Sequence, residues 1–307
     1  MRIYTARTPS FNYRKQLNDL VKGAPEVFIG SRSTYEFTNV VTTITDPWNR
    51  VVSVPGRRWS PWLALSECLW LVAGRNDVAT LLPYNKRITQ WSDDGETMYG
   101  AYGYRLKDQI PDLITRLKKD PNDRRCVLTI WNDADLTAET ADPPCNDIIM
   151  FKIRFGRLNM LVVNRSNDLH WGLYAVNLPQ FSFLQELLAR QMGVSIGEQV
   201  HISNSLHIYN EGPAVGITQG MVKANGKRIQ PLPASGPLIW HDENPSWGDL
   251  VVAANKVLEG GATTGLCFFD FAADFLRSYR DNNFTLVARN SEAYPDWVIA
   301  GRRYFDE

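Results

Sequence analysis

A cysteine that follows two prolines is the first residue of this chain whose type and surroundings could do chemistry. Pro143 and Pro144 restrict the backbone ahead of Cys145 and disfavour a helix there, so we expect the thiol at a defined turn that leads into a strand. A thiol attacks carbon as the thiolate, and nearby arginine or lysine side chains lower its pKa. A buried structural cysteine is the alternative interpretation.

An arginine next to a serine predicts an anion site close to this cysteine. Arg165 and Ser166 follow residues 158–163, whose alternation of apolar and polar residues indicates a strand. The planar guanidinium can bind two oxygens of a phosphate or carboxylate, and the hydroxyl can donate a third hydrogen bond. Arg124 and Arg125 open another strand-like run and repeat the pattern. A solvated surface cluster is the alternative for both pairs.

A carboxylate on an apolar helix is the candidate acid–base group. Ser60 followed by Pro61 predicts the start of a helix with a mostly apolar surface, and Gly74 predicts its end. Glu67 lies within this apolar surround. A buried carboxylate either finds a partner or has its pKa raised toward neutrality, and the second case suits a general acid–base. A glutamate on an exposed face of the helix is the alternative.

A later strand contains two polar rings that could bind a sugar. Residues 200–209 are predicted to form this strand, and side chains two apart on a strand point the same way, so His207 and Tyr209 share a face. Two such donors can hold sugar hydroxyls. A lone histidine in a strand is more often an ordinary core residue, so the pattern alone leaves both interpretations open.

The composition is that of an ordinary globular chain of 307 residues. The 33 lysine and arginine residues balance the 33 aspartate and glutamate residues, so no overall positive field would attract nucleic acid or an anionic membrane. The four cysteines form no C-x-x-C pair, which argues against a zinc site and a disulfide scaffold. No segment has the apolar length of a signal peptide or a membrane span, so we expect a soluble cytoplasmic protein with one domain over residues 1–307.

The remaining elements are predicted from periodicity and residue type. Apolar residues at helical spacing predict helices at 11–22, 78–90, 105–119, 178–192 and 250–258. Runs of β-branched and aromatic residues predict strands at 34–45, 266–271 and 284–289. The glycine-tyrosine series within 92–104 predicts a loop.

Several segments together resemble the thymidylate synthase superfamily, in order and at similar spacing. They are Asp-Arg-Arg-Cys-Val-Leu-Thr-Ile-Trp-Asn (123–132), Pro-Pro-Cys-Asn (143–146), Asn-Arg-Ser-Asn-Asp (164–168), Leu-His-Ile-Tyr (206–209) and the Glu67 helix (65–77). The resemblance extends over roughly residues 30–210. It implies an α+β fold with a large mixed β-sheet packed with helices in a single domain, and a homodimer formed through the sheet.

The resemblance also implies a reaction and a role for each matching residue. In the family, a thiolate adds to C6 of a pyrimidine nucleoside monophosphate, and C5 then attacks a one-carbon unit from 5,10-methylenetetrahydrofolate. Cys145 would be the nucleophile, and Glu67 would organise water and move protons. Arg32, Arg165 and Ser166 are expected to bind the 5′-phosphate, and Arg124 and Arg125 would reach this phosphate from the other subunit of a dimer. Asn177 is expected at the base, and His207 and Tyr209 at the ribose. Asn146 is also expected among the substrate-binding residues. Asp168, Trp91 and Tyr99 are expected beside the folate, with aromatic packing as the alternative for the last two.

Departures from the family pattern bear on the product. Asn146 stands where thymidylate synthases usually have histidine, the segment from Gly172 to Asn177 is one residue longer, and both the loop before Gly100 and residues 302–307 differ from the family's folate-side loop and apolar tail. In the family, methylation needs hydride transfer in a site that excludes water. We therefore predict a 5-hydroxymethyl product.

The substrate is predicted less narrowly than the product. The arginine-serine pair favours a deoxynucleotide, and the insertion before Asn177 leaves dUMP and dCMP both open as substrates of a hydroxymethylase. A divergent thymidylate synthase that methylates dUMP to dTMP is the alternative. A nucleotide-binding protein without chemistry is a further alternative.

Overall fold

The computed structural model describes residues 1–230, 232–233, 235–240, 242–261, 263–284 and 292–306. Within these ranges eight strands form one mixed sheet in the order β1-β3-β8-β6-β5-β4, with β2 beside β3 and β7 beside β8. The strands are β1 (Arg2–Ala6), β2 (Glu26–Ile29), β3 (Arg32–Ile44), β4 (Val127–Thr129), β5 (Asn146–Arg154), β6 (Arg157–Asn164), β7 (Asn167–Asp168) and β8 (Ser195–Tyr209).

Helices make up most of the rest of the described chain. The α-helices are α1 (Pro9–Gly23), α2 (Pro61–Val72), α3 (Val78–Leu81), α4 (Tyr102–Leu106), α5 (Gln109–Lys119), α6 (Leu178–Gln191), α7 (Pro213–Lys223), α8 (Trp247–Leu258), α9 (Cys267–Arg280) and α10 (Pro295–Asp306). Three further helical segments are the 3-10 turns η1 (Ile88–Gln90) and η2 (Asp133–Leu136) and the π-helix η3 (Leu169–Asn177).

The sheet is built around the long strands β3 and β8, which pair antiparallel, while β6 runs parallel to β8. The hairpin of β5 and β6 turns through two residues with positive φ, Phe155 at 52° and Gly156 at 70°. Such a turn matches the right-handed twist of the strands it joins. It fixes the register that places Asn146 opposite Asn164, at the end of the hairpin where the site lies.

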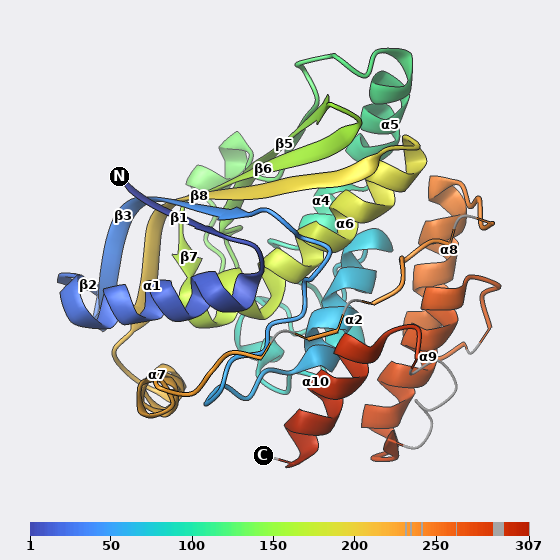
Figure 1. Ribbon diagram of the computed structural model, residues 1–307. Helices are drawn as coiled ribbons and strands as arrows, with labels where there is room; N and C mark the ends of the chain where they lie inside the picture. The colour runs from blue at the N-terminus through green and yellow to red at the C-terminus, as the bar shows by residue number, and fades with distance from the viewer. Residues whose placement is uncertain (231, 234, 241, 262, 285–291, 307) are drawn as a thin grey trace.

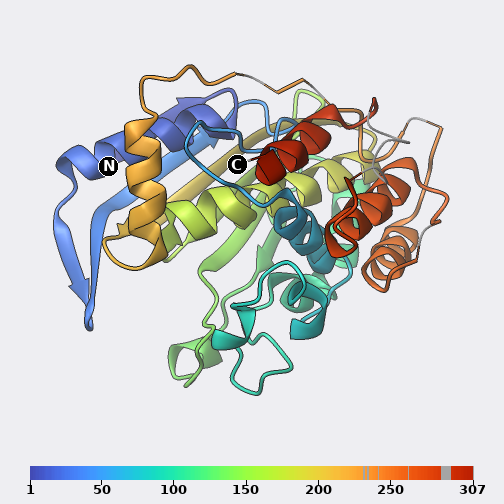
Figure 2. The same cartoon turned by 90° about the horizontal axis from the view of Figure 1, so that it is seen from below.

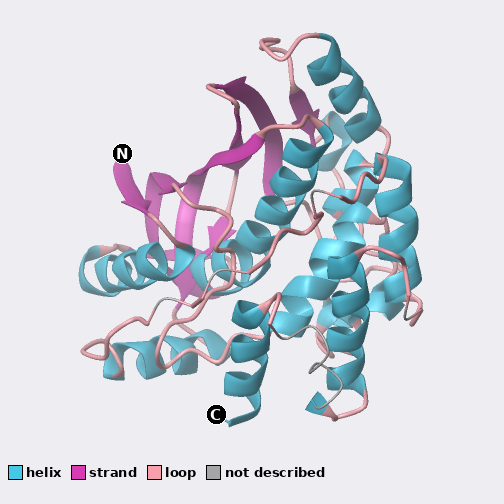
Figure 3. Ribbon diagram, turned by 45° about the vertical axis from the view of Figure 1, so that its right-hand side comes forward, coloured by secondary structure: helices cyan, strands magenta, loops and turns pink. Residues whose placement is uncertain are grey.

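Helices cover one face of the sheet (Figures 1 and 3). Along β6, Leu158, Met160 and Val162 are buried, whereas the alternate residues Leu161 and Val163 are only half-buried. Strand alternation therefore gives the sheet a helix-covered face and a second face that is apolar but incompletely covered. The covering helix α6 is buried along nearly its whole length and joins the sheet to α2.

The last part of the chain forms a separate group of helices on the far side of α2. Figure 2 shows α8, α9 and α10, in orange and red, gathered away from the blue hairpin of β2 and β3. The strand predicted at 266–271 is wrong, because these residues open helix α9. Phe268, Phe271 and Phe275 recur at helical spacing and are fully buried, so tertiary packing overrides the strand preference of phenylalanine.

Most of the other predicted elements are confirmed. The helices at 11–22, 178–192 and 250–258 and the strand at 34–45 correspond to α1, α6, α8 and β3. The helix predicted at 78–90 is wrong beyond its first turn, since Pro83 cannot donate a helical hydrogen bond and the chain continues to the 3-10 turn η1. The helix predicted at 105–119 is split into α4 and α5. The strand predicted at 284–289 lies, after its first residue, outside the described residues.

Candidate active site

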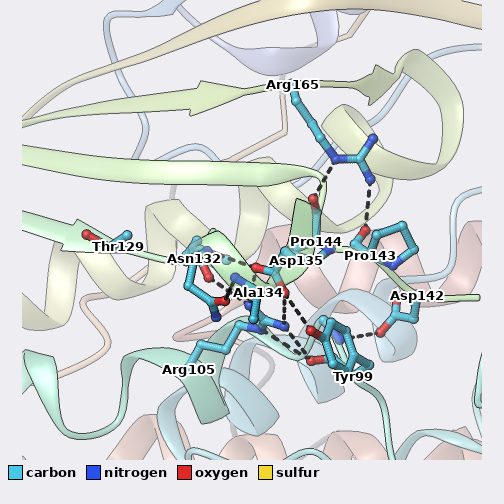
Figure 4. A network of polar contacts seen from close by, with 12 residues as sticks. Tyr99, Arg105, Thr129, Asn132, Ala134, Asp135, Asp142, Pro143, Pro144 and Arg165 are labelled. Carbon is cyan, nitrogen blue, oxygen red and sulfur yellow. Dashed lines mark hydrogen bonds and ion pairs between the residues drawn. The ribbon is translucent and has the colours of Figure 1, made fainter. Parts of the chain in front are cut away.

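The turn that holds Cys145 is fastened by Arg165. The Arg165 side chain donates from Nε to the Pro144 carbonyl at 2.8 Å and from Nη2 to the Pro143 carbonyl at 3.0 Å, as Figure 4 shows. The same Nη2 lies 3.8 Å from the Cys145 Sγ, and the Arg165 backbone N–H donates to the Cys145 carbonyl at 3.1 Å. The two residues that the sequence placed on separate motifs therefore meet, and one guanidinium orients both the turn and the thiol.

The electrostatic balance at the thiol differs from the expected one. Burial raises the pKa of Cys145 above its ordinary value, and the lowering by Arg165 is smaller. The nearby carboxylates Asp142, Asp147 and Asp168 raise this pKa further. The expectation that neighbouring arginine lowers the thiol pKa is confirmed for Arg165, but desolvation outweighs this one close cation, so the net shift is upward.

Glu67 lies on α2, within the apolar surround that the sequence predicted. Ser60 caps this helix by accepting a hydrogen bond from the Leu63 N–H at 3.3 Å. Burial, followed by the negative charge of Asp142, raises the pKa of Glu67 to about 8. Gln180 on α6 donates from Nε2 to Glu67 Oε2 at 2.7 Å. The carboxyl is mostly protonated near neutral pH, so the predicted rise in its pKa is confirmed.

Three residues near the thiol and Glu67 were missed by the sequence interpretation: Asp142, Tyr102 and Gln180. Asp142 accepts a hydrogen bond from the Gly100 N–H at 2.8 Å, and burial raises its pKa to about 6. A Cβ at position 100 would lie 2.5 Å from the Asp142 carbonyl oxygen, so only glycine permits this approach. The contact joins two loops 42 residues apart, and no spacing in the sequence reveals it.

Tyr102 is the aromatic residue of the glycine-tyrosine series that reaches the site. Burial, followed by the charges of Cys145 and Asp142, raises its pKa well above the ordinary value, and the neighbouring Asn146 amide opposes this rise. Its ring stacks on Phe181 with the centroids 5.9 Å apart. The family resemblance pointed to Tyr99 of the same series, and Tyr102 leaves no local pattern that sets it apart before its packing is known.

Tyr99 instead belongs to a polar network beside the site. Its hydroxyl donates to Asp135 at 2.8 Å, and the Arg105 guanidinium lies 4.8 Å from its ring centroid (Figure 4). Arg105 also pairs with the buried Asp135 carboxylate at 2.7 Å. The hydroxyl of Tyr99 is therefore already bonded. Trp91, the other aromatic residue expected beside the folate, is 41% exposed at the end of η1.

The residues expected at the ribose and phosphate form a second cluster. The rings of His207 and Tyr209 are 5.2 Å apart, and the Arg32 guanidinium lies 4.1 Å above the Tyr209 ring. Arg32 opens β3 and pairs with the half-buried Glu211 at 2.8 Å. Asp168 lies opposite His207 in the pairing of β7 with β8. The shared face predicted for His207 and Tyr209 is confirmed.

This second cluster is electrostatically joined to the thiol. Burial raises the pKa of Tyr209 above its ordinary value, and the charges acting on it include those of Arg32, Asp168 and Cys145. Ser166 is half-buried next to Arg165. Arg32, Arg165, Asp168, His207 and Tyr209 thus surround one site.

The insertion before Asn177 is absorbed inside a helix. Residues 169–177 form the π-helix η3, capped by Asp168, whose carboxylate accepts from the His170 N–H at 2.6 Å and the Trp171 N–H at 3.1 Å. A π-helix accommodates extra residues without breaking the helix. Asn177 is buried, and a Cβ at position 172 would lie 3.5 Å from its Nδ2. The extra residue therefore leaves Asn177 in the interior.

Two other expected site residues lie apart from this cluster. Arg124 and Arg125 are exposed ahead of β4, the edge strand next to β5, and Arg125 pairs with Asp123 at 3.0 Å. Asn146, in contrast, follows Cys145 and is fully buried. Its amide N–H acts as a donor toward Tyr102, and its Oδ1 has no partner among the described residues.

A search of the described residues found no group of three or more His, Cys, Asp or Glu side chains that could hold a metal ion. In the same part of the chain no helix is both long enough and apolar enough to cross a membrane.

Comparisons with known proteins agree with this geometry. Residues 54–225 match the family model described as thymidylate synthase. The chain is 34% identical over 247 residues to a deoxyuridylate hydroxymethyltransferase of Bacillus phage SP01, covering 75% of this chain and 64% of the relative. It is 43% identical over 185 residues to the protein of the same name from Pseudomonas phage M6, covering 58% and 53%.

A more distant similarity is 33% identity over 128 residues with a thymidylate synthase of Listeria monocytogenes, covering 41% of this chain and 37% of that enzyme. The chain thus spans between about half and just under two thirds of the length of its phage relatives. The family match covers more than half of the 307 residues and includes the turn of Cys145, the Glu67 helix and the strand of His207. The chain therefore belongs to the thymidylate synthase family.

Proposed function

We propose that this chain transfers a hydroxymethyl group to C5 of dUMP through a covalent adduct of Cys145 at C6. The observation that carries the proposal is the convergence on one site of the Cys145 thiol, 3.8 Å from Arg165 Nη2, and the half-buried acid Glu67, both of which act on Tyr102. Three phage relatives, 29–43% identical, are named deoxyuridylate hydroxymethyltransferase, which supports hydroxymethylation over methylation.

The residues would act in sequence on the base. C5 of uracil is a poor nucleophile until the Cys145 thiolate adds to C6, and Arg165 is placed to stabilise that thiolate. Glu67, largely protonated near neutral pH, would donate a hydrogen bond where negative charge develops on the ring oxygen. The co-substrate 5,10-methylenetetrahydrofolate would supply the one-carbon unit when bound. Asp168, a buried carboxylate at the edge of the same site, fits a donor-rich pterin edge.

The opposite end of the site fits a deoxynucleotide. Arg165, Ser166 and Arg32 would bind the 5′-phosphate, while His207 and Tyr209 would hold the ribose. Asn177 can present both a donor and an acceptor to N3 and O4 of uracil. Its position inside the π-helix η3, rather than in a displaced loop, supports dUMP over dCMP.

The apolar, half-buried face of the sheet suits a homodimer. In neighbouring strands Ile148 pairs with Val163, Val163 with Ile202, and Ile202 with Val41, which makes one apolar row across the sheet. A second row consists of Met150, Leu161 and Val200. Contiguous apolar surface of this extent favours association, and a second copy offers an identical, self-complementary face. Arg124 and Arg125 would then reach the neighbour's phosphate.

One set of assays tests the proposed reaction. The enzyme would be given dUMP, dCMP and CMP separately with 5,10-methylenetetrahydrofolate, and the product would be weighed. We expect dUMP to gain the mass of a methylene group plus water while tetrahydrofolate is left behind. A methylated product with dihydrofolate would instead identify a divergent thymidylate synthase.

A second set of assays tests the nucleophile and excludes a binding protein without chemistry. Incubation with 5-fluoro-dUMP and the folate should give a covalent adduct on Cys145, and an adduct on Cys126 would contradict the assignment. Cys145→Ser should keep mononucleotide binding while turnover is lost. Retained turnover in this variant would rule out the proposed adduct.

Shared sites can be tested by mixing subunits. Arg125→Ala and Cys145→Ser are each expected to be inactive, and hybrids should regain part of the activity through one intact site. No recovery in a sample shown to contain heterodimers would argue against arginines that serve a neighbouring site.

A further inference from the structure

Unpartnered amide atoms lie behind the nucleophile and Glu67. Gln180 is 3% exposed and uses Nε2 to donate to Glu67, but its Oε1 has no hydrogen-bond partner among the described residues. The Asn146 amide N–H acts as a donor toward Tyr102, whereas the buried Oδ1 of Asn146 has no partner there. A buried polar atom left unpaired is costly, so such atoms in a folded protein normally bind an ordered water or a ligand.

These atoms belong to one region of the site. Phe181, the residue after Gln180, stacks on Tyr102. Tyr102 in turn lies beside Asn146 and experiences the charges of both Cys145 and Glu67. Gln180 is thus linked to Glu67 directly, and Asn146 is linked to both Cys145 and Glu67 through Tyr102.

We propose that Gln180 is a positioning residue that orients Glu67 through Nε2 and, together with the Asn146 amide, binds the water that becomes the hydroxyl of the product. The proposal rests on the proposed hydroxymethylation, and it names the groups that select water as the nucleophile. Asn146 Oδ1 and Gln180 Oε1 are both acceptors without a partner among the described residues, and a water bound between them would donate one hydrogen bond to each.

The step that this water undergoes can be written with its atoms and electrons balanced. After the one-carbon unit has reached C5 and the folate has left, the ring carries an exocyclic methylene group conjugated with its C4 carbonyl. The water oxygen bonds to the methylene carbon, the methylene π pair moves through C5 to O4, and the water proton passes to Glu67, which accepts it in the ionised form that is the minor one near neutral pH. Return of the electron pair from O4 restores the ring double bond and expels the Cys145 thiolate from C6.

A second glutamine on α6 also has an unpartnered side-chain oxygen but no hydrogen bond to Glu67 among the described residues. An unpartnered oxygen by itself therefore does not identify a residue that orients Glu67 and binds the water. Gln185 is fully buried and also has an unpartnered Oε1. Its Nε2, however, donates to the backbone carbonyls of Leu158 and Glu198 at 2.8 and 3.1 Å, which fastens α6 to the sheet. Gln180 differs by contacting the catalytic carboxyl, and Gln185 is therefore a matched control.

The test measures how the methylene intermediate divides between water and an added thiol. Wild type, Gln180→Met and Gln185→Met would be incubated with dUMP, the folate and a fixed concentration of 2-mercaptoethanol. Release of tritium from C5 of labelled dUMP counts intermediates formed, and mass spectrometry separates the hydroxymethyl product from the thioether. We expect Gln180→Met to raise the thioether-to-hydroxymethyl ratio about tenfold, since one buried hydrogen bond to the water is lost. Gln185→Met should leave this ratio unchanged.

The pH profile gives a second readout that a packing role would not move. Donation from Gln180 favours the ionised form of Glu67, so its removal should shift the Glu67-dependent limb of the rate profile to higher pH. Gln180→Glu, which keeps the shape and the acceptor oxygens but adds a second carboxyl beside Glu67, should shift this limb further. Its product ratio should stay near wild type below neutral pH. This variant also decides the question if Gln180→Met does not fold.

If the folded Gln180 variants have product ratios within twofold of wild type and an unshifted pH profile, the role of Gln180 is overturned while the proposed function stands. A wild type that forms no hydroxymethyl product would overturn the proposed function together with this inference. The two failures are therefore distinguishable in one experiment.

Discussion

Two buried acidic sites in this molecule share a raised carboxyl pKa but differ in how their neighbours are bonded. At the candidate active site, burial and Asp142 raise the pKa of Glu67 to about 8. Where the C-terminal helices meet the sheet domain, burial raises the pKa of Asp296 to about 7, although the Trp297 N–H and Arg50 oppose the rise. A perturbed pKa alone therefore does not tell a catalytic carboxyl from a structural one.

The bonding of the surrounding groups does separate the two sites. Asp296 accepts hydrogen bonds from the Ser235 hydroxyl and from the Trp297 N–H, the latter at 2.8 Å. Nearby, Glu186 pairs with Arg50 and accepts from the Leu238 N–H at 2.7 Å. Around Glu67, in contrast, the buried amide oxygens of Gln180 and Asn146 have no partner among the residues that the structure describes. Unused hydrogen-bonding capacity next to a nucleophile is what indicates chemistry here.

The largest expected effect is on activity and follows from removing the carboxyl of Glu67, the acid–base group of the proposed reaction. Glu67→Gln should lower kcat by at least about a hundredfold, as loss of a general acid–base group does. Its free energy of unfolding should already exceed that of wild type at pH 7, because Glu67 ionises in the unfolded chain there but stays mostly protonated in the folded one. Steady-state kinetics and chemical denaturation of the same samples measure both quantities.

The pH dependence of this variant provides its control. Because the folded-state pKa of Glu67 is raised from 4.5 to about 8, ionisation destabilises the native state as pH increases through that window. Glu67→Gln should therefore be more stable than wild type at pH 9. Activity within tenfold of wild type, or a large loss of stability at pH 7, would remove the distinction between the two acidic sites.

The second prediction concerns the other acidic site, where Arg50 and Glu186 form a buried pair near Asp296. Arg50→Met leaves the Glu186 carboxylate buried without its cation, and such a change costs about 3–5 kcal/mol of unfolding free energy. The folded variant should keep kcat/KM within about threefold of wild type, because Arg50 contacts no active-site residue named above. Denaturant titration and kinetics at a temperature where the variant is folded test this.

A surface pair serves as the matched control. Arg7 pairs with Asp46 at 3.1 Å, but its side chain is 78% exposed, so Arg7→Met should cost less than about 1 kcal/mol. Equal destabilisation by the two substitutions would show that burial of the Arg50–Glu186 pair has no special weight.

The difference between the two regions also explains what the sequence could predict. Cys145 and Arg165 were identifiable because a proline turn and a strand end each leave a local pattern, and the Glu67 helix has a cap and an apolar surround. Asp142 and Gln180 were not identifiable, since each becomes part of the site through one contact with a distant segment. In the C-terminal helices, phenylalanines of α9 suit either a strand or a helix, and packing against α2 and α8 decides between them.

The third prediction compares the pH dependence of the structural carboxyl with that of Glu67. The folded-state pKa of Asp296 is raised from 3.8 to about 7, so its stabilising protonated form is lost as pH rises through this window. Asp296→Asn removes this ionisation. Its effect on the free energy of unfolding should therefore be more stabilising at pH 8 than at pH 4, by on the order of 2 kcal/mol. Activity should stay within about threefold of wild type. An active-site effect as large as that of Glu67→Gln would contradict the separation.

The smallest effect is expected for the Tyr99 hydroxyl, which is hydrogen-bonded and belongs to the polar network beside the turn of Cys145. The Tyr99 hydroxyl donates to Asp135, which Arg105 also binds, so this hydroxyl resembles the saturated Asp296 site more than the unsaturated surroundings of Glu67. Tyr99→Phe should change kcat and the KM for the folate by no more than about threefold, since an aromatic ring still packs under Arg105. Tyr102→Phe is the matched variant, because Tyr102 lies beside Cys145 and Asn146 and should lower kcat more than Tyr99→Phe does. A tenfold rise in folate KM for Tyr99→Phe alone would return Tyr99 to the folate contact that the family resemblance implied, and would show that a bonded hydroxyl can still be recruited by a ligand.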